Sequence, residues 1–114
     1  MAEQKGIFLD KSGTTEPAPE LWEPAITKKA DFDAEIERLS SIPKPNNGRR
    51  QSWIVHPDSH KLGVGLGLAP GIRPILEVLN PGEQTRPIRH NSTQVNFCIL
   101  GSGHSVIGGK KIGF

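Results

Sequence analysis

The stretch of sequence that decides the fold runs from residue 81 to residue 101 and reads Pro81-Gly82-Glu83-Gln84-Thr85-Arg86-Pro87-Ile88-Arg89-His90-Asn91-Ser92-Thr93-Gln94-Val95-Asn96-Phe97-Cys98-Ile99-Leu100-Gly101. Towards its end, the apolar residues Val95, Phe97 and Ile99 alternate with Asn96 and Cys98. Successive side chains of a strand point to opposite faces, so this period of two predicts a β-strand. Turn residues open the stretch and a Gly-Ser-Gly turn closes it, which gives the strand clear ends.

Similar short apolar runs lie on both sides of this stretch. Alternate positions from 62 to 68 are aliphatic, with glycine between them, and residues 72–79 form an apolar run with Pro74 near its start. Downstream, Gly108-Gly109 separates two short runs and is typical of a two-residue hairpin turn. From about residue 62 to residue 114 we therefore predict antiparallel strands of an all-β barrel or sandwich.

The first part of the chain has a different character. Residues 1–24 are polar and rich in proline, and we expect an extended arm that is pinned by Trp22 if it is ordered. Residues 31–39 carry an apolar stripe at helical spacing, with Asp31 as the expected N-cap and Leu39 at the end of the stripe. Residues 43–51 are expected to form a loop. The chain thus divides into an arm, helix and loop at 1–51 and a β-domain at 52–114.

Composition excludes several classes of protein. The net charge is only +2, and the nearest basic cluster, Lys44 with Arg49 and Arg50, is interpreted as a solvated loop and not as a nucleic-acid surface. No apolar run approaches the roughly 20 residues that span a bilayer, and no signal peptide is recognised, so a soluble, cytoplasmic protein without a membrane partner is expected. The single cysteine, Cys98, excludes an internal disulfide and a Cys-based zinc cluster. Its place in an apolar run predicts a buried side chain.

The quoted stretch resembles the first motif of the cupin superfamily, in which a glycine is followed by a His-x-His pair, a glutamate and a closing glycine. Gly82, His90 and Gly101 fall in register with that motif, whereas Ile88 stands at the first histidine and Gln94 at the glutamate. Alternate residues of one strand point the same way, so the motif presents two imidazoles to one metal ion. The resemblance implies a cupin-like antiparallel β-barrel, of which this chain is the front part.

Within that superfamily, residues 76–109 look most like gentisate 1,2-dioxygenases and related enzymes that cleave aromatic rings. The matching features are Pro81-Gly82-Glu83, Arg89-His90, Phe97, Gly101-Ser102-Gly103 and Val106. The resemblance implies Fe(II) on three histidines, a small aromatic acid as substrate and a role in aromatic compound catabolism. His90 matches the second histidine, and the third belongs to a second motif that is expected only beyond Phe114.

Each candidate site residue also has an ordinary structural interpretation. His90 is either a metal ligand or a hydrogen-bonded strand histidine, and Arg89 (or Arg86) either binds a substrate carboxylate or faces solvent. His56 and His60 have the spacing of a helical metal pair, but Pro57 between them favours a loop. His104 follows a glycine turn and is expected at the surface of a strand.

Two functions remain open from the sequence. The first is an iron-dependent ring-cleaving dioxygenase, or a degenerate relative of one, that does not hold its metal tightly in this chain alone. The second is a non-enzymatic cupin barrel with a small-molecule-binding or structural role. In either case, an open strand edge and an uncovered apolar face predict association, as a homodimer or with missing residues of the same protein.

Overall fold

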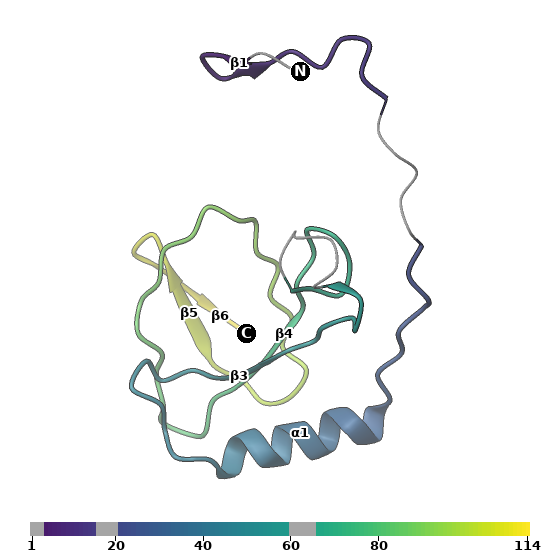
Figure 1. Cartoon of the computed structure of the whole chain (residues 1–114). Coiled ribbons are helices and arrows are strands. Elements are labelled where there is room, and N and C mark those ends of the chain that lie inside the picture. The colour runs from purple at the N-terminus through teal and green to yellow at the C-terminus, as the bar shows by residue number, and fades with distance from the viewer. Residues whose placement is uncertain (1–3, 16–20, 60–65) are drawn as a thin grey trace.

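The computed structural model describes residues 4–15, 21–59 and 66–114 (Figure 1). In chain order, the elements are β1 (Gln4–Lys5), β2 (Phe8–Leu9), α1 (Lys29–Ser41), β3 (Arg50–Trp53), β4 (Ile75–Val78), β5 (His104–Ile107) and β6 (Lys110–Gly113). The strands pair as three separate two-stranded antiparallel sheets, β1–β2, β3–β4 and β5–β6. Antiparallel strands with one helix are thus confirmed, while the described residues close no barrel.

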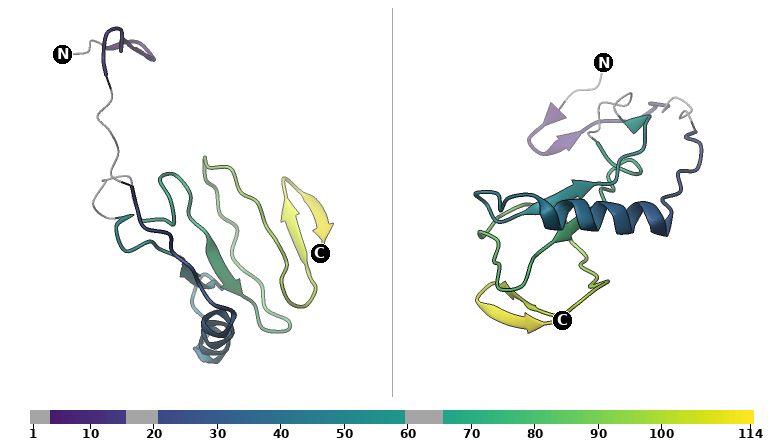
Figure 2. Two further views of the ribbon diagram at one scale, coloured as in Figure 1. Left: turned by 90° about the vertical axis from the view of Figure 1, so that its right-hand side faces the viewer. Right: turned by 90° about the horizontal axis from the view of Figure 1, so that it is seen from below.

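Helix α1 occurs where the apolar stripe predicts it, with longer bounds than expected. It begins after Lys28, which has extended backbone and makes no side-chain cap, so the expectation that Asp31 caps the helix is wrong. Asp31 lies in the first turn instead, where its negative carboxylate interacts favourably with the positive end of the helix dipole. Leu39 is buried, and α1 lies against β3 and β4 (Figure 2). The helix therefore packs on the β3–β4 sheet with most of its residues exposed.

Helix α1 packs against the two-stranded β3–β4 sheet. Its register runs from Arg50 opposite Val78 to Trp53 opposite Ile75, and Ile54 adds a bond by donating its N–H to the carbonyl of Pro74 at 3.0 Å. Pro74 precedes β4, as a proline at a strand start should, because it has no N–H to donate. The loop expected at 43–51 is shorter than predicted, since β3 already begins at residue 50.

Two turns follow their sequence signals closely. Residues 80–83 form a turn in which the Glu83 N–H donates to the Asn80 carbonyl at 3.0 Å. At the hairpin between β5 and β6, Gly108 and Gly109 have φ of 57° and 80°, the conformation that a two-residue hairpin turn requires. The predicted hairpin is confirmed.

The strand expected around residues 95–99 is not formed. No strand lies between β4 and β5, and this part of the ribbon runs beside its neighbours without pairing (Figure 2). Val95 and Phe97 are 91% and 86% exposed, and Cys98 is exposed, so the expectation of a buried cysteine is wrong. Its thiol donates to the carbonyls of Leu100 and Gly101. The physical reason is that the described chain offers this segment neither a partner strand nor a covering surface.

Part of the predicted run at 62–68 lies outside the described residues, as does His60. The remaining positions, 66–68, form a bend, not a strand, and Leu68 donates its N–H to the carbonyl of Ile72 at 2.9 Å.

The described fold is open. The radius of gyration is 18.8 Å, whereas a compact domain of this length has about 13 Å. Leu39 is the one apolar side chain that is buried among the described residues. In the same part of the chain, no helix combines the length and apolarity needed to cross a membrane.

Candidate functional site

A buried polar cluster, which we call the Arg50–Glu83 anchor, joins helix α1 to the turn that opens the motif. The Arg50 guanidinium, 5% exposed, pairs with the Glu83 carboxylate, and its Nε donates to the carbonyl of Ile42 at 3.2 Å. Glu83 also accepts the N–H of Asn80 at 2.7 Å, while the Asn80 side chain donates to the carbonyl of Ser40 at 3.0 Å. Two carbonyls at the end of the helix thus receive donors that the helix itself cannot supply.

The anchor changes the pKa of the Glu83 carboxyl. The hydrogen bond from Arg50 lowers the pKa of the Glu83 carboxyl below its ordinary value of 4.5, despite the opposing effect of partial burial, and the Asn80 N–H adds to this lowering. Glu83 is therefore a carboxylate at neutral pH. The pair contributes to stability as an ion pair whose charges face one another away from bulk water.

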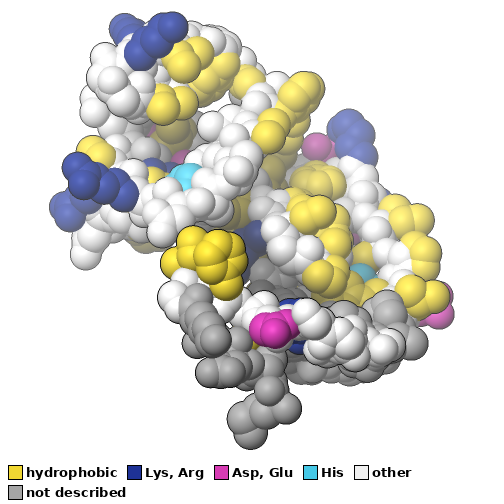
Figure 3. All heavy atoms as spheres, turned by 90° about the horizontal axis from the view of Figure 1, so that it is seen from above, with side chains coloured by type: hydrophobic (Ala, Val, Ile, Leu, Met, Phe, Trp, Pro, Cys, Tyr) yellow, Lys and Arg dark blue, Asp and Glu magenta, His cyan; other side chains and the backbone are white. Residues whose placement is uncertain are grey.

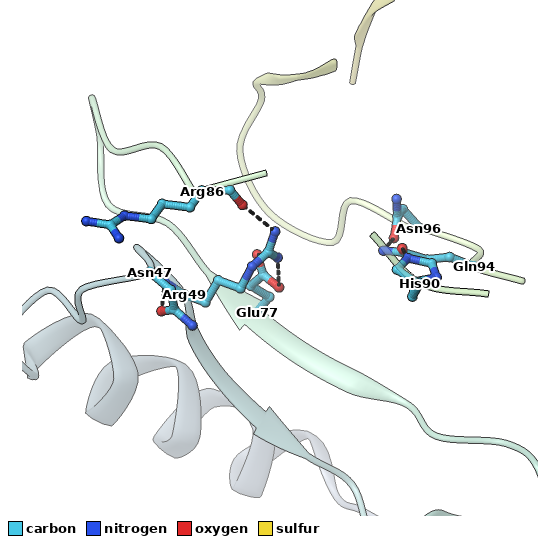
Figure 4. A network of polar contacts seen from close by, with 7 residues as sticks. All are labelled: Asn47, Arg49, Glu77, Arg86, His90, Gln94 and Asn96. Atoms are coloured by element: carbon cyan, nitrogen blue, oxygen red, sulfur yellow. Dashed lines mark hydrogen bonds and ion pairs between the residues drawn. The ribbon is translucent and has the colours of Figure 1, made fainter. Parts of the chain in front are cut away.

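A second contact holds the chain a few residues further on, as Figure 4 shows. The Arg49 guanidinium lies 3.3 Å from both carboxylate oxygens of Glu77 and donates to the carbonyl of Arg86 at 3.1 Å. The N–H of Arg86 donates to the carbonyl of Asn47 at 2.9 Å. The interpretation of Arg49 and Arg50 as solvated loop charges is therefore wrong, because both guanidinium groups bind carboxylates within the fold.

Gly48 makes this second contact possible. It has φ of 71°, and a Cβ at this position would lie 2.2 Å from the carbonyl oxygen of Gln84. Only glycine combines the left-handed backbone with so close an approach. The segment 80–86 is consequently fixed against the loop that precedes β3, and it delivers the motif residues that follow.

The motif positions of His90 and Gln94 lie together in the structure. His90 Nε2 is 2.8 Å from Gln94 Oε1, and His90 Nδ1 is 3.0 Å from the carbonyl oxygen of Ser92. Gln94 continues the row by donating from Nε2 to Asn96 Oδ1 at 2.8 Å (Figure 4). The tautomer that fits these contacts donates from Nε2–H to Gln94 Oε1, and its Nδ1 accepts from the Ser92 hydroxyl at 3.1 Å. Both ring nitrogens are thus engaged.

Next to this row lies a shallow, open hollow that is lined by Ile88, Arg89, His90 and Asn91. Arg89 is exposed, and its guanidinium makes no hydrogen bond or ion pair within the described ranges. Arg86 is exposed too, but its backbone is held on both sides by the loop before β3. Of these two arginines, only Arg89 lines the hollow.

One comparison with known proteins found a relative of this chain. The chain is 30% identical over 107 residues to a protein named 5-nitrosalicylic acid 1,2-dioxygenase from Bradyrhizobium sp. The chain is distantly related to a dioxygenase. The match covers 90% of this chain and 48% of the relative, so the chain spans about half the length of the curated relative that it matches. No family model matches the chain, and no solved structure matches it significantly.

Because the relative is a dioxygenase, iron is the metal against which the candidate ligands are compared. The residues of this site do not supply the ligands that iron needs. A non-haem ferrous site takes about three protein ligands on one face of the metal. His90 supplies one imidazole that already bonds to Ser92 and Gln94, and Gln94 could supply a neutral amide oxygen. Ile88 has no donor atom. No group of three or more His, Cys, Asp or Glu side chains suited to a metal occurs in the described part of the chain.

His56 and His104 lie elsewhere in the described part of the chain and have separate roles. His56 is buried, stacks on Trp22 at a ring distance of 4.8 Å and contacts the carbonyl of Glu23 through Nε2 at 2.7 Å. Its Nδ1 accepts the N–H of Asp58 at 3.0 Å. Trp22 thus pins the arm to the folded part, as expected. His104 is exposed on β5, which confirms its prediction as a surface strand residue.

Proposed function

We propose that this chain forms part of a cupin-type barrel from the ring-cleaving dioxygenase group, and that it binds a small aromatic acid. The supporting observation is the free guanidinium of Arg89 in the open hollow beside His90. The distant relationship to a dioxygenase named for 5-nitrosalicylic acid agrees with such a ligand.

In this proposal, Arg89 holds the ligand carboxylate. A guanidinium presents parallel N–H groups that match the two oxygens of a carboxylate, which fixes the orientation of the ring as well as its charge. Ile88 offers an apolar side chain for the ring edge. The Arg50–Glu83 anchor and the Arg49 contacts hold the segment that carries both residues. Iron chemistry is not assigned to these residues, because their donor set does not fit the metal.

A non-enzymatic binding barrel is the second candidate, and the side chain of Ile88 favours it. An aliphatic residue at the position of the first motif histidine is consistent with a site whose metal has been lost. The two candidates share the binding of an aromatic acid and differ in whether the complete protein turns it over with dioxygen.

The binding proposal predicts an effect of Arg89→Ala on affinity for 5-nitrosalicylate. Loss of a charge-assisted hydrogen bond costs about 1.5–3 kcal/mol, so the Kd should rise at least about tenfold. Titration calorimetry measures the Kd of each variant for 5-nitrosalicylate. The comparison ligand is 4-nitrophenol, which has the same nitrophenol ring without the carboxylate. Lys110→Ala, at an exposed lysine on the β5–β6 hairpin, is the matched control and should leave the Kd unchanged. Equal losses for Arg89→Ala and Lys110→Ala would mean that the carboxylate has no defined site.

A further inference from the structure

A hydrogen-bonded row of polar side chains beside the hollow has no role in the proposed function. The Ser92 hydroxyl donates to His90 Nδ1 at 3.1 Å, and His90 Nε2–H donates to Gln94 Oε1 at 2.8 Å. All three residues are exposed, and histidine side chains are open to solvent on the face of the molecule drawn in Figure 3. A hydroxyl, an imidazole and an oxygen acceptor in this order form the arrangement in which a base activates a nucleophile.

The contacts of Gln94 fix the direction of the row. Its Nε2 donates to Asn96 Oδ1 at 2.8 Å, so Oε1 is the atom that faces His90 (Figure 4). Because an amide oxygen only accepts, the ring carries its proton on Nε2 and leaves Nδ1 to accept from the Ser92 hydroxyl. An amide side chain stands beside the histidine in the same way in Cys-His-Asn hydrolases.

The same geometry also accommodates the protonated ring. Once Nδ1 has taken the proton of the Ser92 hydroxyl, it becomes a donor, and the Ser92 carbonyl oxygen lies 3.0 Å away. Nε2–H keeps its acceptor on Gln94. The imidazolium therefore has an acceptor at each nitrogen, and these acceptors stabilise the positive charge that develops on the ring as the hydroxyl loses its proton.

The hollow gives an ester a place next to this row. His90 is one of its lining residues, and its chain neighbours Arg89 and Asn91 line it too. Both neighbours carry N–H donors in their side chains. Such donors stabilise the negative oxygen that forms when a nucleophile attacks a carbonyl carbon. A base and donors for the oxyanion thus line one open hollow, with the nucleophile bonded to that base.

We propose that Ser92 is a nucleophile that accepts acyl groups from activated esters, with His90 as its general base and Gln94 as the positioning residue of that base. Ser92 Oγ attacks the carbonyl carbon while its proton passes to His90 Nδ1. The C–O bond of the ester then breaks, and the alcohol or phenol leaves with that proton. Water, activated by His90, hydrolyses the acyl-serine to the carboxylic acid and restores the hydroxyl. This activity does not depend on the binding of an aromatic acid.

The test treats the full chain with 4-nitrophenyl acetate, quenches in acid and locates the acetyl groups by mass spectrometry of peptides. Ser92 should be acetylated at least about a hundredfold faster than Ser102, an exposed serine with no histidine contact in the described part of the chain. His90→Gln should slow the acetylation of Ser92 by a similar factor. Gln94→Ala should slow it about tenfold, the effect of one hydrogen bond, whereas Gln94→Glu keeps an acceptor and should retain the rate.

These substitutions lie at exposed positions, and circular dichroism checks that each variant keeps helix α1. Acetylation of Ser92 that is no faster than that of Ser102, or that is unchanged in His90→Gln, would overturn the proposal. So would an unchanged rate of 4-nitrophenolate release in Ser92→Ala, because another group would then be the nucleophile. Equal rates of Ser92 acetylation in Gln94→Ala and the unchanged chain would contradict the positioning role of Gln94.

Discussion

Replacing Leu39 by alanine should lower the free energy of unfolding by about 2–5 kcal/mol, the range for a buried leucine that leaves a cavity. Leu39 is 1% exposed and is the one apolar side chain buried within the described ranges, where α1 meets the β3–β4 sheet. A domain with so little apolar burial has little stability to lose. The variant is therefore expected to unfold cooperatively at much lower urea concentration, or to lose its helix at 25 °C.

Leu21→Ala is the matched control for this prediction. Leu21 is 87% exposed, and the same three carbon atoms are removed without opening a cavity. Circular dichroism during urea unfolding should show a midpoint close to that of the unchanged protein. Equal midpoints for Leu39→Ala and Leu21→Ala would show that α1 does not pack through Leu39.

The second large effect is expected at the Arg50–Glu83 anchor. Arg50→Ala leaves the Glu83 carboxylate, 14% exposed, without its cation, and it also removes a donor from the carbonyl of Ile42. Removing one partner of a buried ion pair is strongly destabilising, because the remaining charge has lost its water and its partner. The exposed pair of Lys29 with Asp33 is the comparison, since such helix pairs contribute about 0.3–0.5 kcal/mol. Lys29→Ala should therefore shift the urea midpoint far less.

The same anchor predicts a dependence of stability on pH. The pKa of Glu83 is lower in the folded protein than in the unfolded chain. As the pH falls below about 4.5, Glu83 therefore takes up a proton more readily in the unfolded chain than in the folded protein. The stabilisation by Glu83 is complete above that value and is lost as the pH falls through the folded pKa. Glu83→Gln should be less stable at pH 7 and should lose less stability on acidification. Glu37→Gln, at an exposed position on α1, should keep the full acid dependence.

Local features were predictable from the sequence because their causes are local. The apolar stripe of α1 and the glycine pair of the last hairpin each specify a conformation within a few residues. The turn at residues 80–83 follows the same logic. The N-cap was missed because the helix begins without a side-chain cap, so Asp31 had no role there to detect.

Features that depend on distant partners could not be predicted. Arg50 and Glu83 are 33 residues apart, and nothing in either neighbourhood indicates the pairing. The strand expected at residues 95–99 has the correct alternation, but a strand also needs a neighbour to bond to. Cys98 is exposed for the same reason. The contact of His90 with Gln94 was not predicted either, because a bend at residues 91 and 92 brings the two side chains together.

The metal content of the purified chain is the most direct test of the central claim, that these residues supply only one imidazole to a site that needs three ligands. After anaerobic incubation with ferrous iron and gel filtration, we expect well under one equivalent of iron per chain, with little change in His90→Ala. Ile88→His should raise retention only when further ligands are present in the same protein. Stoichiometric iron that is lost in His90→Ala, together with dioxygen uptake on adding gentisate, would contradict the account.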